Sequence, residues 1–298
     1  MNLQNFTKRV IKGMEDVLKD GYQIEPREIQ KNNGVLVHAV TIHYQGENMT
    51  PCIPMDNFYK EYQAGNIGIA DVVGEILYLY QKNSGGYTLD TNFFPEYPKA
   101  RPHLHGRLVN TEKNQGLLEE MPHRNFLDLS LTYLLEVPVP GKSTGYIQVF
   151  PEHLEHWGID EQCLYEEVMR QITEPGQVLL KSMNEIVGQI TGSDMQDSPN
   201  PAYILTNSNY QNGAVQMLNQ PVLESAASIL KGDFLLLPSS VHELILLPIH
   251  PGEDREAQVR QLADIVLEVN DTQLREEELL SYHVYQYCRE TKEIVIAM

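Results

Sequence analysis

The residues whose types are best suited to chemistry lie together in Ser239-Ser240-Val241-His242-Glu243. Serine hydroxyls beside a histidine and a carboxylate are the groups of a nucleophilic site, in which the imidazole takes the proton of the attacking hydroxyl. The same residue types also form turns, because serine hydroxyls bond to nearby backbone groups. Catalysis and a turn are therefore the two interpretations to compare.

The flanking sequence favours the turn. The apolar runs DFLLLP and ELILLP lie on either side and are typical of strands, so that Ser-Ser-Val-His would join them as a hairpin. A serine nucleophile on a strand-to-helix elbow would lie within Gly-x-Ser-x-Gly, and a zinc peptidase would need histidine where Leu246 stands. Neighbouring strand residues also point to opposite faces, so His242 and Glu243 do not easily serve one site. We interpret the segment as a hairpin, with Ser240, His242 and Glu243 as the catalytic alternative.

A second polar segment, RLVNTEKNQGLLEEMPHRNFLDL at residues 107–129, gathers side chains that could line a ligand site. Arginine in such a site would bind a carboxylate or a phosphate. The same side chains could instead form Asx turns and caps that join a loop to a sheet. The candidate ligand- or partner-binding residues are Arg107, Asn110, Asn114, His123, Arg124 and Asp128.

Histidines suggest a metal site only weakly. In His103-Leu104-His105 the two imidazoles would share one face of a strand, and further ligands would have to come from His123, His153 or His156. No Cys-x-x-Cys pair, phosphate-binding Gly-x-x-x-x-Gly-Lys or dinucleotide-binding glycine pattern is present in the sequence. We expect a solvated strand face, no metal and no cofactor.

Charge is the strongest compositional signal. The chain carries 41 Asp and Glu against 22 Lys and Arg, a net charge of −19. Residues 1–110 are nearly balanced, with 11 basic and 12 acidic residues, whereas residues 111–298 have 11 basic and 29 acidic residues. Such a field repels nucleic acids and membranes and attracts basic protein surfaces.

The acidity has two interpretations. It could serve solubility alone, or it could form a surface that imitates the phosphates of a nucleic acid. The residues assigned to such an acidic surface are Glu152, Glu155, Glu161, Glu166, Glu167, Glu276, Glu277 and Glu278.

Apolar spacing predicts an α+β fold with mostly antiparallel sheets and flanking helices. Two strands joined through KNNG follow an N-terminal helix, residues 125–137 read as one strand, and VLLKSMNEIVGQI at residues 178–190 reads as a helix. Asp160 is expected to cap the helix that follows it. Residues 191–197, rich in Gly, Ser and Asp, predict a linker between an N-terminal domain, residues 1–190, and a C-terminal domain, residues 198–298.

The sequence also predicts a cytoplasmic location. The first residues have helical spacing without a signal-peptide apolar run, and no stretch approaches the roughly 18 apolar residues of a membrane span. The three cysteines, Cys52, Cys163 and Cys288, are widely separated, which is typical of a reducing compartment.

Several segments together resemble a known family. They are KNNG, PMDNFYKEYQAG, RLVNTEKNQGLLEEMPHRNFLDL, HWGIDEQCLYEE, YILTN, LPSSVHELILLP and LLSYHVYQY. This order is similar to that of an uncharacterised family from anaerobic Gram-positive gut bacteria, whose members often lie on mobile elements. The resemblance implies a bacterial cytoplasmic setting and makes LPSSVHE a family motif, and it implies no activity and no catalytic residue.

Two functions follow as hypotheses. The preferred one is a non-enzymatic acidic protein that binds a basic protein partner, for example a mobile-element inhibitor of a host nucleic-acid-binding or CRISPR effector, without direct contact to nucleic acid or membrane. The alternative is an enzyme or small-ligand-binding protein that uses the Arg107–Asp128 segment and the Ser239–Glu243 motif.

Overall fold

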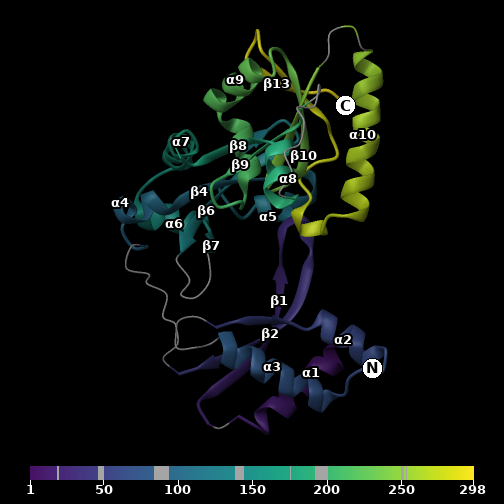
Figure 1. The fold of residues 1–298 in the computed structure, drawn as a ribbon. Helices are drawn as coiled ribbons and strands as arrows, with labels where there is room; N and C mark the ends of the chain where they lie inside the picture. The colour runs from purple at the N-terminus through teal and green to yellow at the C-terminus, as the bar shows by residue number, and fades with distance from the viewer. Residues whose placement is uncertain are drawn as a thin grey trace. The chain divides into compact units, whose positions relative to one another are not determined.

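The computed structural model describes residues 1–18, 20–45, 50–83, 94–137, 144–174, 176–191, 201–249, 252 and 254–298. The chain forms two compact units, one of residues 1–92 and 137–145 and one of residues 93–136 and 146–298 (Figure 1). Helices and antiparallel sheets occur in both units, so the predicted α+β class is confirmed.

In its described residues, the first unit packs three α-helices against a small antiparallel sheet. Its elements are α1 (Leu3–Glu15), β1 (Tyr22–Gln30), β2 (Leu36–Tyr44), β3 (Cys52–Pro54), α2 (Asp56–Gln63) and α3 (Ile69–Asn83), with strand order β1-β2-β3. Phe6, Val10 and Met14 on α1 are fully buried against Ile42 and Ile76. The expected hairpin is confirmed by the β1–β2 pairing.

As far as its residues are described, the second unit begins with a four-stranded antiparallel sheet. Its elements are α4 (Tyr97–Ala100), β4 (Leu104–Asn110), α5 (Gln115–Leu118), β5 (His123–Phe126), β6 (Leu129–Val137) and β7 (Gly145–Gln148). Strand β6 lies between β4 and β5 and also pairs with β7. One face of this sheet is apolar, with Leu104, Leu108, Leu131 and Tyr133 in the main core.

The larger sheet of the second unit has six strands within the described residues, in the order β13-β12-β10-β11-β9-β8. The strands are β8 (Val178–Ser182), β9 (Tyr203–Asn207), β10 (Phe234–Ser240), β11 (Glu243–Pro248), β12 (Tyr285–Cys288) and β13 (Glu293–Ile296). The helices are α6 (Pro151–Trp157), α7 (Glu161–Ile172), α8 (Met183–Thr191), α9 (Gln220–Ile229) and α10 (Arg255–Thr272), together with the short 3₁₀ helices η4 (Gly213–Leu218) and η5 (Glu276–Glu278).

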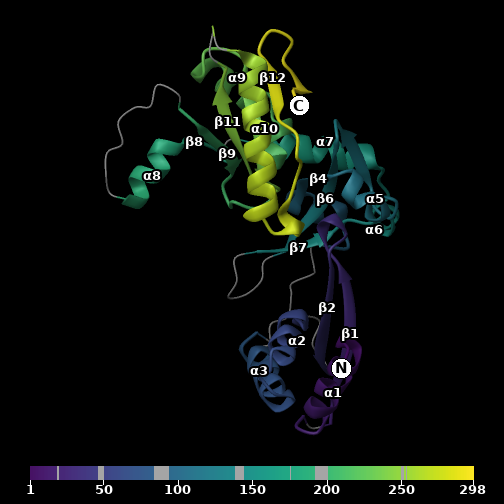
Figure 2. The same cartoon turned by 90° about the vertical axis from the view of Figure 1, so that its right-hand side faces the viewer.

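The continuous apolar runs of β10 and β11 are explained by burial on both sheet faces. Phe234 and Leu236 point into the main core, whereas Leu235 and Leu237 pack with Val259 of α10. Figures 1 and 2 show α10 lying along one side of this sheet. Among the described residues, no helix combines the length and the apolar character needed to cross a membrane.

Two predicted elements are wrong. The run 125–137 is two strands, because Leu127, with φ of 56°, turns the chain between β5 and β6. The segment 178–190 begins as strand β8 and becomes helix α8 at Met183, because residues 178–182 pair with β9 in register.

The compact units also differ from the predicted division. The expected boundary at residues 191–197 falls within the second unit, where β8 on its N-terminal side pairs with β9 on its C-terminal side. Residues 192–197 of the expected linker lie outside the described residues.

Candidate functional site

The Ser239–Glu243 segment is a tight β10–β11 hairpin, as predicted, with Ser240 paired to Glu243 in register. The Ser240 hydroxyl accepts the backbone N–H of His242 at 3.0 Å, which closes the turn. The Ser239 hydroxyl donates to Glu243 Oε1 at 3.5 Å, at the limit of a hydrogen bond. Both hydroxyls therefore shape the turn.

The imidazole of His242 has a structural contact rather than a catalytic one. Its Nδ1 accepts the backbone N–H of Asn212 at 3.1 Å, and its Nε2 lies 3.8 Å from Glu278 Oε1. A general base needs a hydrogen bond to the nucleophile, and within the described residues neither serine hydroxyl bonds to this ring. The geometry thus gives Ser240, His242 and Glu243 no nucleophile–base pair.

Instead, the hairpin turn supports the loop between β9 and η4. Thr206 Oγ1 donates to the His242 carbonyl at 2.7 Å, and the Ala214 N–H donates to the Val241 carbonyl at 3.2 Å. Gly213 packs so closely that an added Cβ would lie 2.2 Å from Thr206 Oγ1 and 2.5 Å from the His242 carbonyl oxygen. The turn therefore fixes the path of residues 206–214.

This loop forms one wall of a narrow pocket in the second unit. The pocket is lined by His105, Gly106, Tyr146, Val168, Gln171, Ile172, Gln177, Asn207, Gln211, Asn212, Val215 and Gln216. The cavity volume that water-sized groups can occupy is about 30 Å³. For comparison, one water needs roughly 10–15 Å³. Carboxamides dominate the lining and provide both donors and acceptors. The pocket therefore suits the slender, neutral, polar end of a ligand.

His105 is the ionisable side chain best placed to contribute to this pocket. Its Nε2 lies 2.7 Å from Glu136 Oε2, and this hydrogen bond lowers the pKa of Glu136. The ring packs edge-on against Tyr146, whose hydroxyl accepts Asn209 Nδ2–H at 3.0 Å. Burial raises the pKa of Tyr146, so its phenol stays neutral and can donate.

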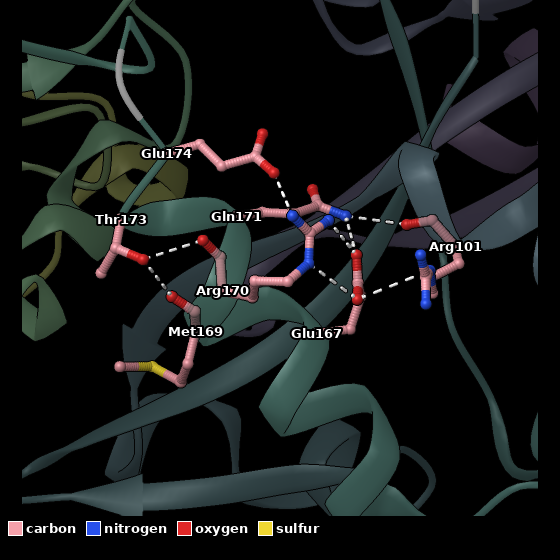
Figure 3. A network of polar contacts seen from close by, with 7 residues as sticks. All are labelled: Arg101, Glu167, Met169, Arg170, Gln171, Thr173 and Glu174. Carbon is pink, nitrogen blue, oxygen red and sulfur yellow. Dashed lines mark hydrogen bonds and ion pairs between the residues drawn. The ribbon is translucent and has the colours of Figure 1, made fainter.

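Gln171 is held in the pocket wall by the polar network of Figure 3. Its Nε2 donates to the Arg101 carbonyl at 2.7 Å and to Glu167 Oε1 at 3.0 Å. Glu167, which is buried, also pairs with Arg170 at 2.6 Å and with Arg101 at 3.6 Å. Burial alone would raise the pKa of Glu167, but these contacts outweigh it and the pKa is lowered.

The six candidates of the 107–129 segment do not form one site. Asn110 caps a turn by accepting the Lys113 N–H at 2.9 Å, and buried Asn114 donates to the Asn110 carbonyl at 2.8 Å. Arg124 donates to Glu161 at 2.7 Å and lies 3.8 Å over the Tyr165 ring, facing α7. Arg107 lies on the other face of the sheet from Arg124, as the strand alternation requires.

Asp128 is the centre of a polar cluster that the sequence did not reveal. Its carboxylate accepts hydrogen bonds from Ser281 Oγ at 2.8 Å, His283 Nδ1 at 2.9 Å and Tyr285 OH at 2.8 Å. Burial alone would raise the pKa of Asp128, but these bonds outweigh it and lower the pKa. The spacing Ser281-x-His283-x-Tyr285 is a sequence signal for this cluster, because alternate residues of an extended segment would share one side. In the structure the chain bends at Tyr282, where the His283 N–H donates to Ser281 Oγ at 3.0 Å, and the strand begins at Tyr285.

The predicted acidic surface is divided by intramolecular ion pairs. Glu152 and Glu155 are exposed on α6, and Glu166 is exposed on α7 and accepts Gln162 Nε2–H at 2.7 Å. The other predicted members are held by basic partners: Glu161 by Arg124, Glu167 by Arg101 and Arg170, Glu276 by Lys113, and Glu277 and Glu278 by Arg275.

The histidines do not converge on a metal site in the part of the chain that the structure describes, where no group of three His, Cys, Asp or Glu side chains has suitable geometry. His153 accepts the Phe150 N–H at 2.9 Å and stacks on Trp157. His123 is near the Met121 carbonyl, 3.1 Å from Nδ1.

The fold and the site define an α+β protein with an amide-lined pocket that a hairpin turn supports. Residues 3–289 match the model of a family of unknown function, DUF5688, and the chain belongs to that family. No match was found among curated proteins or among solved structures.

Proposed function

We propose that the protein is a non-enzymatic binding protein whose second unit attracts a basic protein partner. The observation that carries the proposal is the uneven charge, with 29 acidic and 11 basic residues in 111–298. Glu152 and Glu155 are exposed on the short helix α6. Carboxylates of this kind steer a basic surface through long-range attraction and are screened by salt.

The partner that best fits this charge is a protein with a nucleic-acid-binding surface. Its basic groups are arranged for phosphates, so carboxylates on rigid helices can compete for them. The concrete form of the proposal is an inhibitor, carried on a mobile element of a Gram-positive gut bacterium, that blocks a host nucleic-acid-binding or CRISPR effector in the cytoplasm.

Charge reversal tests this proposal. Tagged wild-type protein and the variant Glu152→Lys/Glu155→Lys would capture proteins from a lysate of the bacterial host, with bound proteins quantified by mass spectrometry. A basic partner should be retained several-fold less by the variant. The control Glu15→Lys/Glu75→Lys makes the same charge change at exposed sites of the first unit and should retain it. Equal loss in both variants, or in neither, contradicts the assignment to α6.

A second candidate function, small-ligand binding, is favoured by the amide-lined pocket. Its lining has His105 and Tyr146 and otherwise neutral side chains, so a neutral group that both donates and accepts hydrogen bonds would match it best. The Ser239–Glu243 motif contributes here by fixing the loop rather than by reacting.

Side-chain amide NMR signals test this second candidate. Acetamide and a nucleoside serve as probes, and saturable shifts of the Gln171, Gln177 and Gln211 signals are expected in the wild type. The variant Gln177→Leu should weaken these shifts. Absence of saturable shifts with either probe removes this candidate and leaves the first one untouched.

A further inference from the structure

The second face of the four-stranded sheet carries a group of polar side chains beside buried Val109 and Leu134. Cross-strand register places Arg107 of β4 opposite Thr132 of β6, and Thr132 opposite His123 of β5. Directly opposed residues point to the same face, so these three side chains form one row across the sheet. Thr132 at the centre is fully buried, whereas its two neighbours are partly exposed.

Arg107 has no acidic partner among the described residues. Its Nη2 donates to Gln148 Oε1 at 3.2 Å, and its Nε is enclosed without a hydrogen-bond acceptor. Gln148 is itself fixed, because its Nε2 donates to the Tyr133 and Val149 carbonyls at 2.9 and 3.2 Å. The guanidinium is therefore held in place by neutral groups alone.

This arrangement is unexpected in a chain with 41 carboxylates. Arg101, Arg124 and Arg170 each have a carboxylate within 4 Å. The acidic residue that shares the face of Arg107 on β6 is Glu136, and its carboxylate is bound to His105 at 2.7 Å. Burial lowers the pKa of Arg107 to about 10, since an enclosed cation without a counter-charge is unfavourable.

His123 completes the row with a second donor. Its Nδ1 lies 3.1 Å from the Met121 carbonyl and must donate to it, because a carbonyl only accepts. That contact fixes the ring, and Nε2 donates to an anion in the imidazolium form, in which both ring nitrogens carry a proton. The outer strands of the row are about 10 Å apart, twice the usual strand spacing. Two long side chains that lean toward each other across this distance would bring their donors to about 6 Å, the span of an oxyanion with a hydrogen bond of about 3 Å on each side.

We infer that Arg107 and His123 form a binding site for a small oxyanion, a phosphate or carboxylate group, on this second face of the four-stranded sheet. The anion supplies the counter-charge that Arg107 lacks. Arginine suits either group, because its planar N–H groups match two oxygens at once. The site lies apart from the exposed carboxylates of α6 and is independent of the proposed partner binding.

Anion-dependent thermal stability tests this inference. The fluorescence of Trp157, the single tryptophan and a member of the core of the second unit, would follow unfolding with added inorganic phosphate or, separately, acetate at constant ionic strength. The wild type should gain about 2–4 °C in Tm, saturating near 20 mM for a site of roughly millimolar Kd. The anion that gives the larger gain identifies the ligand class.

Variants separate a specific site from a general salt effect. Arg107→Gln should lose the gain in Tm, and His123→Gln should reduce it. Arg260→Gln, at an exposed arginine paired with Glu256 on α10, should keep the full gain. An equal gain in Arg107→Gln, or no saturable gain in the wild type, overturns the inference. If Arg107→Gln does not fold, the Arg107 Nε–H NMR signal in the wild type gives the same decision, because a bound anion must shift it.

Discussion

At the scale of single residues, His242 has the imidazole of a catalytic base, but its contacts hold the loop at Asn212 in place. A ring nitrogen that accepts the Asn212 N–H is not available to a serine hydroxyl. The sequence could predict the hairpin, because two apolar strands enclosed a short polar turn. It could not predict the loop that the turn holds, since Asn212 and His242 are far apart along the chain.

Gly213 is the residue most sensitive to change at this support. In Gly213→Ala the new methyl group would meet Thr206 Oγ1 and the backbone of Asn207 and His242 at 2.2–2.7 Å. We expect a loss of about 1–3 kcal/mol in the free energy of unfolding, as for overpacked cores, measured by urea denaturation. Gly116→Ala, whose Cβ would meet nothing within 4 Å, should change it by less than about 0.5 kcal/mol. Equal stability of the two variants would show that the loop packs loosely.

Asp128 gives a pH-dependent prediction. Because its folded pKa is lowered, its ionised form stabilises the fold above the ordinary pKa of 3.8, and this contribution is lost as the pH falls through the lower folded pKa. Asp128→Asn should cost about 1–3 kcal/mol at neutral pH and progressively less below pH 4. Urea denaturation at several pH values measures this, with Asp264→Asn, an exposed change on α10, as the control. A cost that does not shrink in acid contradicts the account.

At the scale of elements, helix α7 begins at the residue that the sequence predicts, but the ion pairs of its Glu167 were not predicted. Asp160 caps it by accepting the Cys163 N–H at 3.0 Å, as expected. Glu167 looked like one of several surface carboxylates, yet it is buried against Arg101 and Arg170. Sequence spacing could have suggested the Arg170 contact, at i and i+3 on a helix, but Arg101 comes from a distant segment.

The adjacent residues Glu166 and Glu167 provide a matched test of these ion pairs. Glu167→Gln removes the charge from two arginine contacts and should cost about 1–3 kcal/mol of unfolding free energy, since hydrogen bonds to charged groups are lost. Glu166→Gln, at an exposed position, should have little effect. The difference between the variants in urea denaturation is the measurement. Similar stabilities would mean that solvent replaces the Glu167 contacts without loss.

Two of the strands show why element prediction was incomplete. The apolar run 125–137 gave no local sign of a turn, because leucine rarely adopts a φ of 56°. At this turn the neighbouring Asp128 makes contacts with residues that are distant in the sequence. Residues 178–182 continue smoothly into a helical pattern, and only pairing with β9 makes them a strand. Both elements depend on partners that are remote in sequence.

At the scale of the whole molecule, the distribution of charge along the chain was available from the sequence. The ion pairs that the carboxylates form in the folded protein were not. Five of the eight predicted surface carboxylates have basic partners in the described residues, at Glu161, Glu167, Glu276, Glu277 and Glu278. The acidic excess nevertheless stays with residues 111–298. The proposed partner binding depends on this excess rather than on any single carboxylate.

The most direct test of that proposal is the salt dependence of capture from host lysate. Tagged wild-type protein would be washed first at low and then at high ionic strength, and the proteins released would be identified by mass spectrometry. A stoichiometric basic partner that stays bound at low salt and leaves at high salt is the predicted result, because screening weakens contacts between exposed charges. A partner that stays bound equally at both salts, or no partner at either, would contradict binding through the acidic surface.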